Sequence, residues 1–280
     1  MALIDQLLNL IGLVLWLSWH SDGQPAQIRG AGTLLSNLKP VETRRARRWL
    51  YPLALVVLLA IRPLLYATLA PVLDWTPTLA PGPVSLAFRA DDPKRLLAFS
   101  FLSFAWCLLL FRAGLMLLAS LGRREGDPAG LSRWVRELAG STAQWPLAAV
   151  LLAPILTMAI AWIMITLGLR QIGVLPPEPL TIGRLLTQSS VVGLAVWLPI
   201  RWLLATLLVL RLVHDYVYLG DHSLWEFVRS TGGRLLRPLE WLPARIGRFD
   251  FNPLIAAVLV LVTGEALKIA LIEAYQWLGR

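Results

Sequence analysis

Residues 146–167 read PLAAVLLAPILTMAIAWIMITL, a run of 22 residues without a charged side chain. A helix needs about 20 mostly apolar residues to cross the hydrocarbon core of a bilayer. Similar, mostly apolar segments recur along the chain. Together with residues 146–167 there are six: residues 3–19, 49–72, 96–121, 146–167, 185–218 and 253–277. The pattern predicts an all-α fold, a polytopic transmembrane bundle of about six helices. Barrel strands would instead alternate apolar and polar residues.

Composition agrees with this class. Hydrophobic residues make up 57% and charged residues 15% of the 280, and the mean hydropathy is +0.64. An average soluble domain carries about a quarter charged residues. So much apolar surface requires lipid around it.

The first segment is the weakest of the six. Its opening turns carry Asp5, Gln6 and Asn9, which are poorly suited to hydrocarbon. It lacks the basic n-region and the small-residue cleavage site of a signal peptide. We therefore expect a retained helix.

Basic residues predict the orientation. The first, third and fifth loops together hold 15 Lys and Arg, whereas the second and fourth hold 5. By the positive-inside rule the odd-numbered loops face the cytoplasm and both termini lie outside. The net charge of +9 favours anionic lipid headgroups as partners, and no basic, aromatic-interleaved patch indicates nucleic acid.

The chain also repeats an order of landmarks. Residues 108–122 (LLLFRAGLMLLASLG) are followed by LSRWVRELAGS and then Pro146, and residues 207–221 (LLVLRLVHDYVYLGD) by SLWEFVRSTGG and later Pro253. Arg112 and Arg211 occupy matching places in these two copies. The unit predicted is helix, cytoplasmic amphipathic segment, helix. It divides the chain into residues 1–95, 96–175 and 180–280, of which the first would be a degenerate copy. Chance similarity among Leu-rich helices is the alternative to a repeat.

The second copy carries an additional stretch, TGGRLLRPLEWLPARIGRFDFNPLIAAVLVL, at residues 231–261. It resembles the YggT (YlmG) family of small membrane proteins, whose repeat ends in the form T-x-P-L-L-R-P-L-R-x-x-I-P-P-x-G-G-I-D-h-S-P-h-h-A. The matching positions are Thr231, Leu235, Leu236, Arg237, Pro238, Leu239, Pro243, Gly247, Asp250, Pro253 and Ala256. The departures are Gly233, Glu240, Ala244, Arg248 and Asn252. Arg211 would correspond to the intramembrane arginine of the family.

The resemblance implies a divergent, N-terminally extended member in the bacterial plasma membrane. It implies a non-enzymatic assembly or organising factor, serving cell division, envelope organisation or cytochrome maturation. Other relatives imply the alternative of a transporter or channel component in ion or osmotic adaptation. Other membrane proteins, or further copies of the chain, would be its protein partners.

The composition of residues 234–251 itself indicates a segment that lies at the membrane surface. Pro238 and Pro243 bracket a short stretch in which Trp241 can dip into the membrane interface while Arg237 and its neighbours meet headgroups. We expect the segment to dock on the cytoplasmic face as a recognition element; a plain connector is the alternative. Asp250 or Asn252 is placed to cap the helix that begins at Pro253.

Charges inside the spans require partners. The spacing pairs Arg211 with Asp215 and Glu265 with Lys268, and Glu265 is the alternative partner of Arg211. Arg62 and Arg201 stand beside Pro63 and Pro199, so each guanidinium is expected to bind carbonyls freed by the proline. Structural pairing and a polar seam that handles an ion or proton are both open.

Catalytic patterns are missing from the sequence. Cys107 is the single cysteine, and His20, His214 and His222 are scattered, so neither a metal site nor haem ligation is indicated. There is no P-loop, nucleophile elbow or His-Glu-x-x-His. We expect no enzyme and no cofactor.

Overall fold

The structure is a computed structural model. It describes residues 2–21, 48–69, 75–122, 130–171, 173–175, 181–217, 220, 222–239, 244–246 and 249–278. The side chains of residues 2, 21, 245, 246, 249 and 278 are not described.

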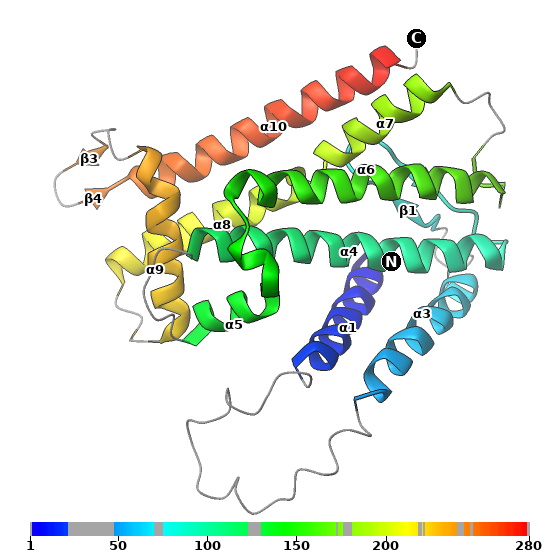
Figure 1. Cartoon of the computed structure of the whole chain (residues 1–280), viewed down its shortest axis with the longest axis horizontal. Coiled ribbons are helices and arrows are strands. Elements are labelled where there is room, and N and C mark those ends of the chain that lie inside the picture. Colours follow the sequence, from blue (N-terminus) through cyan, green and yellow to red (C-terminus); the bar gives the residue numbers. More distant parts are fainter. Residues whose placement is uncertain are drawn as a thin grey trace, which may run out of the picture. The chain divides into compact units, whose positions relative to one another are not determined.

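Long helices dominate the described part of the chain (Figure 1). Six stretches of it are long and apolar enough to cross a membrane. Five are single helices: α1 (Ala2–Ser21), α3 (Leu50–Leu69), α4 (Pro93–Leu121), α6 (Leu147–Gln171) and α10 (Asn252–Leu278). The prediction of an all-α, polytopic transmembrane bundle is confirmed.

The sixth stretch differs from its prediction. Residues 185–218 were expected to form one helix, but the structure has α7 (Ile182–Leu194) and α8 (Trp197–Tyr216) with a turn at residues 195–196. Pro199 lies in the first turn of α8 and has no N–H to donate to the carbonyl of Ala195 four residues earlier. That carbonyl accepts from the Leu198 N–H instead, at 3.0 Å, in a tighter turn than that of an α-helix.

The chain divides into two compact units. The first comprises residues 1–79 and 86–108, and the second residues 80–85 and 109–280. Each unit is described by itself below. Residues 1–95, 96–175 and 180–280 remain a predicted division.

In the first unit, α1 and α3 pack together and α4 contributes its N-terminal half. Two short strands, β1 (Thr78–Leu79) and β2 (Leu86–Ala87), pair antiparallel, with Thr78 opposite Ala87. An aromatic cluster fills the space beside them: the ring of Phe99 lies 5.6 Å from that of Tyr66 and 5.5 Å from that of Phe88. The hairpin was not predicted, since its strands are only two residues long.

In the second unit, α8 packs along α10 and α6 along α7. Small side chains permit this: Ala205 on α8 and Ala256 and Ala257 on α10 are buried in one cluster. Gly193 on α7 lies so close to the carbonyl of Ile155 on α6 that a β-carbon there would collide with it. Gly82 is similarly close to Ala195 at the α7–α8 turn, and its φ of +74° favours glycine.

Two amphipathic helices complete the second unit. They are α5 (Gly130–Ala139), which continues into the 3₁₀ helix η5 (Gly140–Gln144), and α9 (Ser223–Leu236), which continues into η6 (Arg237–Leu239). Both were predicted as amphipathic segments, and both link one spanning helix to the next. A second short hairpin, β3 (Arg245–Ile246) with β4 (Phe249–Asp250), precedes α10 and was not predicted.

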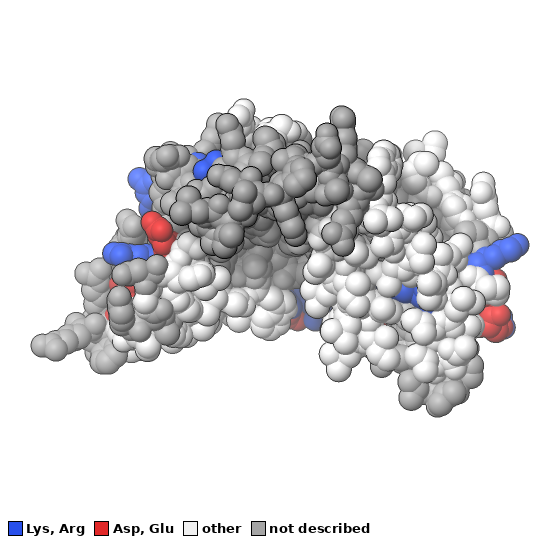
Figure 2. All heavy atoms as spheres, turned by 90° about the horizontal axis from the view of Figure 1, so that it is seen from below, with Lys and Arg blue, Asp and Glu red and all other residues white. Residues whose placement is uncertain are grey.

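The surface agrees with a lipid environment. Figure 2 shows one face of the molecule on which uncharged residues cover most of the described area and charged residues are few. Spanning helices expose large apolar side chains, among them Ile160 and Met164 on α6 and Val262 on α10. Exposed apolar surface on this scale is stable in hydrocarbon and not in water.

Candidate functional site

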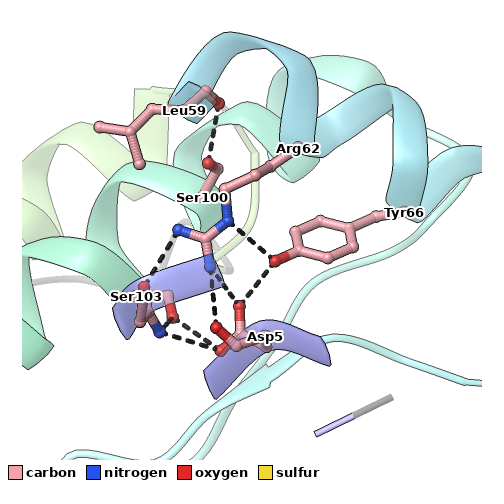
Figure 3. Close-up of polar contacts among 7 residues, drawn as sticks. Asp5, Leu59, Arg62, Tyr66, Ser100 and Ser103 are labelled. Carbon is pink, nitrogen blue, oxygen red and sulfur yellow. Dashed lines mark hydrogen bonds and ion pairs between the residues drawn. The ribbon is translucent and has the colours of Figure 1, made fainter. Parts of the chain in front are cut away.

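A buried arginine organises the first unit. Arg62, on α3, has no exposed surface, although it lies within a candidate membrane span. Its Nη2 forms an ion pair with Asp5 Oδ1 on α1 at 2.6 Å, and its Nη1 donates to Asn9 Oδ1 at 3.0 Å. Its Nε donates to the Tyr66 hydroxyl at 3.1 Å (Figure 3). Every nitrogen of the guanidinium therefore has a polar partner.

The Asp5 carboxylate is equally well satisfied. Its Oδ1 also accepts from the Tyr66 hydroxyl at 2.7 Å, and its Oδ2 accepts from Ser103 Oγ on α4 at 2.9 Å. Asn9 Nδ2 donates both to Asp5 Oδ2, at 3.3 Å, and to Ser103 Oγ, at 2.9 Å. These five side chains tie α1, α3 and α4 into one network. We call Asp5, Asn9, Arg62, Tyr66 and Ser103 the Arg62 network.

Pro63 leaves a carbonyl without its helical donor, as predicted, but Arg62 does not take it. The affected carbonyl is that of Leu59, four residues before the proline, and α3 continues through Pro63 to Leu69. Ser100 Oγ on α4 donates to this carbonyl at 2.8 Å (Figure 3). The expectation for Arg62 was wrong because Asp5, an anion, is a stronger partner for a guanidinium than a neutral carbonyl.

Sequence reasoning missed the Arg62 network and read its α1 members as a weakness of the first helix. Asp5 and Asn9 are four residues apart, as are Arg62 and Tyr66, so each pair lies on one helical face. That spacing was the available signal. It marks α1 and α3 as helices with complementary polar faces.

Two other arginines hold the amphipathic helices. Arg112 on α4 donates from Nη1 to the carbonyl of Leu138 on α5 at 2.9 Å. Arg211 on α8 donates from Nη1 to the carbonyl of Arg229 on α9. In both cases an arginine of a spanning helix binds the backbone of the amphipathic helix that follows it.

Arg211 also meets its predicted acidic partner. Its Nε lies 3.6 Å from Asp215 Oδ2, one turn further along α8, so this pairing is confirmed. The alternative pairing with Glu265 does not form. Gly232 and Gly233 on α9 lie against the Arg211 side chain, and a β-carbon at Gly232 would overlap its aliphatic part. These glycines let α9 approach α8 closely.

The two amphipathic helices touch each other. Helices α5 and α9 are in contact, and Gly130 at the start of α5 lies against the Ser223 side chain at the start of α9. Gly130 has a φ of +57°, so the close approach and the backbone both favour glycine. On α9, Trp225 stacks on His214 of α8 with ring centroids 5.8 Å apart. We call α5 and α9 together the paired-helix surface.

A further cluster of charged side chains lies between α8 and α10. Arg201 Nη1 is 2.8 Å from Glu265 Oε2, and Lys268 Nζ is 2.9 Å from Glu265 Oε1. The Glu265–Lys268 pair was predicted. Arg201 was expected to bind a carbonyl freed by Pro199, and this was wrong, because Leu198 takes the carbonyl of Ala195 and Glu265 takes the guanidinium. Gly264 lies against the aliphatic part of Arg201 and makes room for it.

The predicted recognition segment is described only in part. Arg237 and Pro238 are exposed at the end of α9, whereas Trp241 and Pro243 fall outside the described residues. Asp250 Oδ1 accepts from the Asn252 N–H at 3.0 Å, so the predicted cap of α10 is present. The Tyr216 hydroxyl, at the end of α8, donates to the Asp250 carbonyl and accepts from its N–H. Pro253 is buried in the first turn of α10.

Metal chemistry has no support in the described residues, where no three His, Cys, Asp or Glu side chains gather in a way that could hold an ion. His214 is engaged in its ring stack with Trp225.

Comparison with known proteins adds no relative. No family model matches the chain, and no curated protein or solved structure matches it. The six long, apolar helical stretches indicate a multi-pass membrane protein.

Proposed function

We propose that this protein is a non-enzymatic organising or assembly factor of the bacterial plasma membrane, of the type that the YggT resemblance implies. The observation that carries the proposal is the paired-helix surface. Two amphipathic helices from separate parts of the chain lie together, and each is fixed to its spanning helix by an arginine, Arg112 or Arg211. A surface held in this way is preorganised for binding.

The basic residues indicate which side of the membrane the paired-helix surface faces and what it binds. The positive-inside rule puts α5 and α9 in the cytoplasm, since they belong to the arginine-rich third and fifth loops. Trp134 on α5 and Arg229 on α9 are exposed there. Aromatic and arginine side chains are enriched where proteins bind each other. Other membrane proteins, docked above anionic headgroups, are the proposed partners.

We propose that the two units of helix, amphipathic helix and helix are copies of one internal repeat. Arg112 and Arg211 occupy matching places in the sequence, and each donates a hydrogen bond to a backbone carbonyl of the amphipathic helix that follows it. The segment from Arg234 to Phe251 then extends the second copy. We propose that it adds to the same docking surface.

Copurification tests the proposal. The tagged chain would be purified from native membranes, together with a Trp134→Ala/Arg229→Ala variant and a control, Ile160→Ala/Met164→Ala, which changes exposed residues of α6. We expect the wild type and the control to retain one set of proteins that the paired-helix variant loses. If that variant keeps every partner and complements a deletion strain, the proposal is wrong.

One observation favours transport as a second candidate. The Arg201–Glu265–Lys268 cluster lies in the spans close to the α7–α8 interruption, and broken helices with nearby charge line the substrate sites of many transporters. Purified protein in liposomes would then carry an ion flux that Glu265→Gln abolishes. Flux with no copurifying partner would favour this candidate over the first.

A further inference from the structure

The turn between α7 and α8 lies near the centre of the bilayer. Gly193, just before the turn, lies against the carbonyl of Ile155 and the side chain of Ala159 on α6. Ala159 is the middle residue of α6, which has 25 residues and is therefore about 38 Å long, against roughly 30 Å for the hydrocarbon core. The middle of such a helix stays close to the bilayer centre wherever its two ends settle. The α7–α8 turn therefore lies at this depth.

The loop between β1 and β2 reaches this turn. Its residues 80–85, which we call the hairpin tip, belong to the second unit. A β-carbon at Gly82 would collide with the side chain of Ala195 in the turn, and the Leu198 side chain is close to the same point. Ala195 has no exposed surface. The hairpin tip therefore shares the depth of the turn, in the interior of the membrane.

The backbone of the hairpin tip is suited to apolar surroundings. An N–H group without an acceptor is costly in hydrocarbon, where no water can replace the missing partner. Pro81 and Pro83 have no N–H, and the Gly82 N–H donates to the carbonyl of Ala80 at 2.9 Å. From residue 81 to residue 83, no N–H is left without an acceptor.

The chain on the far side of β2 returns to the membrane surface. In the first unit the ring of Phe88 lies 5.5 Å from that of Phe99, which is nearly two turns inside α4. The next residue, Arg89, pairs with Asp91 at 2.8 Å, and both side chains are mostly exposed. Four residues of extended chain span up to about 13 Å, close to half the thickness of the hydrocarbon core. Arg89 can therefore lie at the surface while Ser85 lies near the centre.

We propose that residues 75–88 form a re-entrant hairpin, which enters and leaves the membrane on one side and restrains the turn between α7 and α8. Turns between helices are common hinges. Because Gly82 leaves no room for a side chain against Ala195, the hairpin tip fits closely on this hinge and opposes its bending. The inference goes beyond the proposed function, since it concerns a different part of the chain from α5 and α9.

Spin labels on the purified protein in lipid nanodiscs test the depth. In a Cys107→Ala background, labelled cysteines would replace Ser85, Ala87 and Arg89, which alternate along the chain and are all exposed. Oxygen concentrates in the bilayer interior, whereas a nickel chelate stays in water. The ratio of oxygen to nickel collisions should rise from Arg89→Cys through Ala87→Cys to Ser85→Cys. A ratio that does not rise toward Ser85→Cys overturns the inference.

Distances between two spin labels test the restraint on the hinge. In the same background, labels at Ile182→Cys on α7 and Val209→Cys on α8, both exposed, would report the angle across the turn. Gly82→Val should shift or broaden the distribution of distances, because the added side chain displaces the hairpin tip from Ala195. Ala80→Val, at an exposed position of the same tip, is the control and should leave the distribution unchanged.

Two results would overturn the restraint. One is a distance distribution in Gly82→Val that equals that of the wild type, and the other is the same change in Gly82→Val and Ala80→Val. The depth measurement leaves Gly82 in place, so it decides whether the hairpin is re-entrant even where Gly82→Val fails to fold.

Discussion

Replacing Arg62 with leucine removes the cation of the Arg62 network and leaves the Asp5 carboxylate without its counter-ion. In the structure Arg62 is fully buried and forms hydrogen bonds to Asp5, Asn9 and Tyr66. Removing one partner of a buried ion pair costs roughly 3–5 kcal/mol, because the other charge stays buried and uncompensated. Asp5 keeps the hydroxyls of Tyr66 and Ser103 as donors, so we expect about 3 kcal/mol, at the lower end of that range.

The double variant Asp5→Leu/Arg62→Leu provides the internal comparison. Apolar residues of similar volume often replace a buried ion pair at little cost, or even with a gain in stability. Asp5→Leu alone should be at least as harmful as Arg62→Leu, since it leaves a fully buried guanidinium. The double variant should therefore be more stable than either single one.

Unfolding of the purified protein in mixed micelles, titrated with SDS, would measure the four free energies. The coupling between the two positions should be about 2 kcal/mol or more, well above the ~0.5 kcal/mol expected of independent sites. If Arg62→Leu unfolds as the wild type does, or if the two changes simply add, the Arg62 network does not hold α1 against α3 and α4.

Three further variants follow from single contacts. Ser100→Ala should lower the free energy of unfolding by about 1–3 kcal/mol, because it leaves the Leu59 carbonyl without a donor. In a Pro63→Ala background the loss should be much smaller, because the helix then supplies its own N–H. Equal losses in both backgrounds, measured by the same SDS titration, would contradict this. Gly264→Leu should displace Arg201, separate α8 from α10 and so lower the thermal stability in detergent. Gly183→Leu, at a position with no neighbouring atoms, should not. Equal losses of thermal stability in the two variants would refute the packing argument. Arg211→Leu should make α9 more accessible to limited proteolysis, and unchanged cleavage would mean that the arginine merely extends to the membrane surface.

Hydropathy was sufficient to predict the spans, but it did not predict the turn that separates α7 from α8. Residues 185–218 are mostly apolar on both sides of residues 195–196, so the hydropathy of the segment does not mark the turn there. The amphipathic pattern predicted α5 and α9, but their mutual contact depends on how the spanning helices pack. The Arg62 network joins residues 57 apart along the chain, and its formation depends on the rotation of α1 and α3. Periodicity restricts that rotation to a face and does not identify the partner.

The functional account depends most directly on the side of the membrane that α5 faces. In a Cys107→Ala background, Trp134→Cys on α5 and Trp277→Cys near the end of α10 would be exposed to a membrane-impermeant maleimide in spheroplasts, before and after permeabilisation. Both residues are exposed in the structure. The account predicts labelling of Trp277→Cys in intact spheroplasts and of Trp134→Cys only after permeabilisation. Labelling of Trp134→Cys from outside would place the paired-helix surface on the wrong side for a cytoplasmic organising role and would contradict the account.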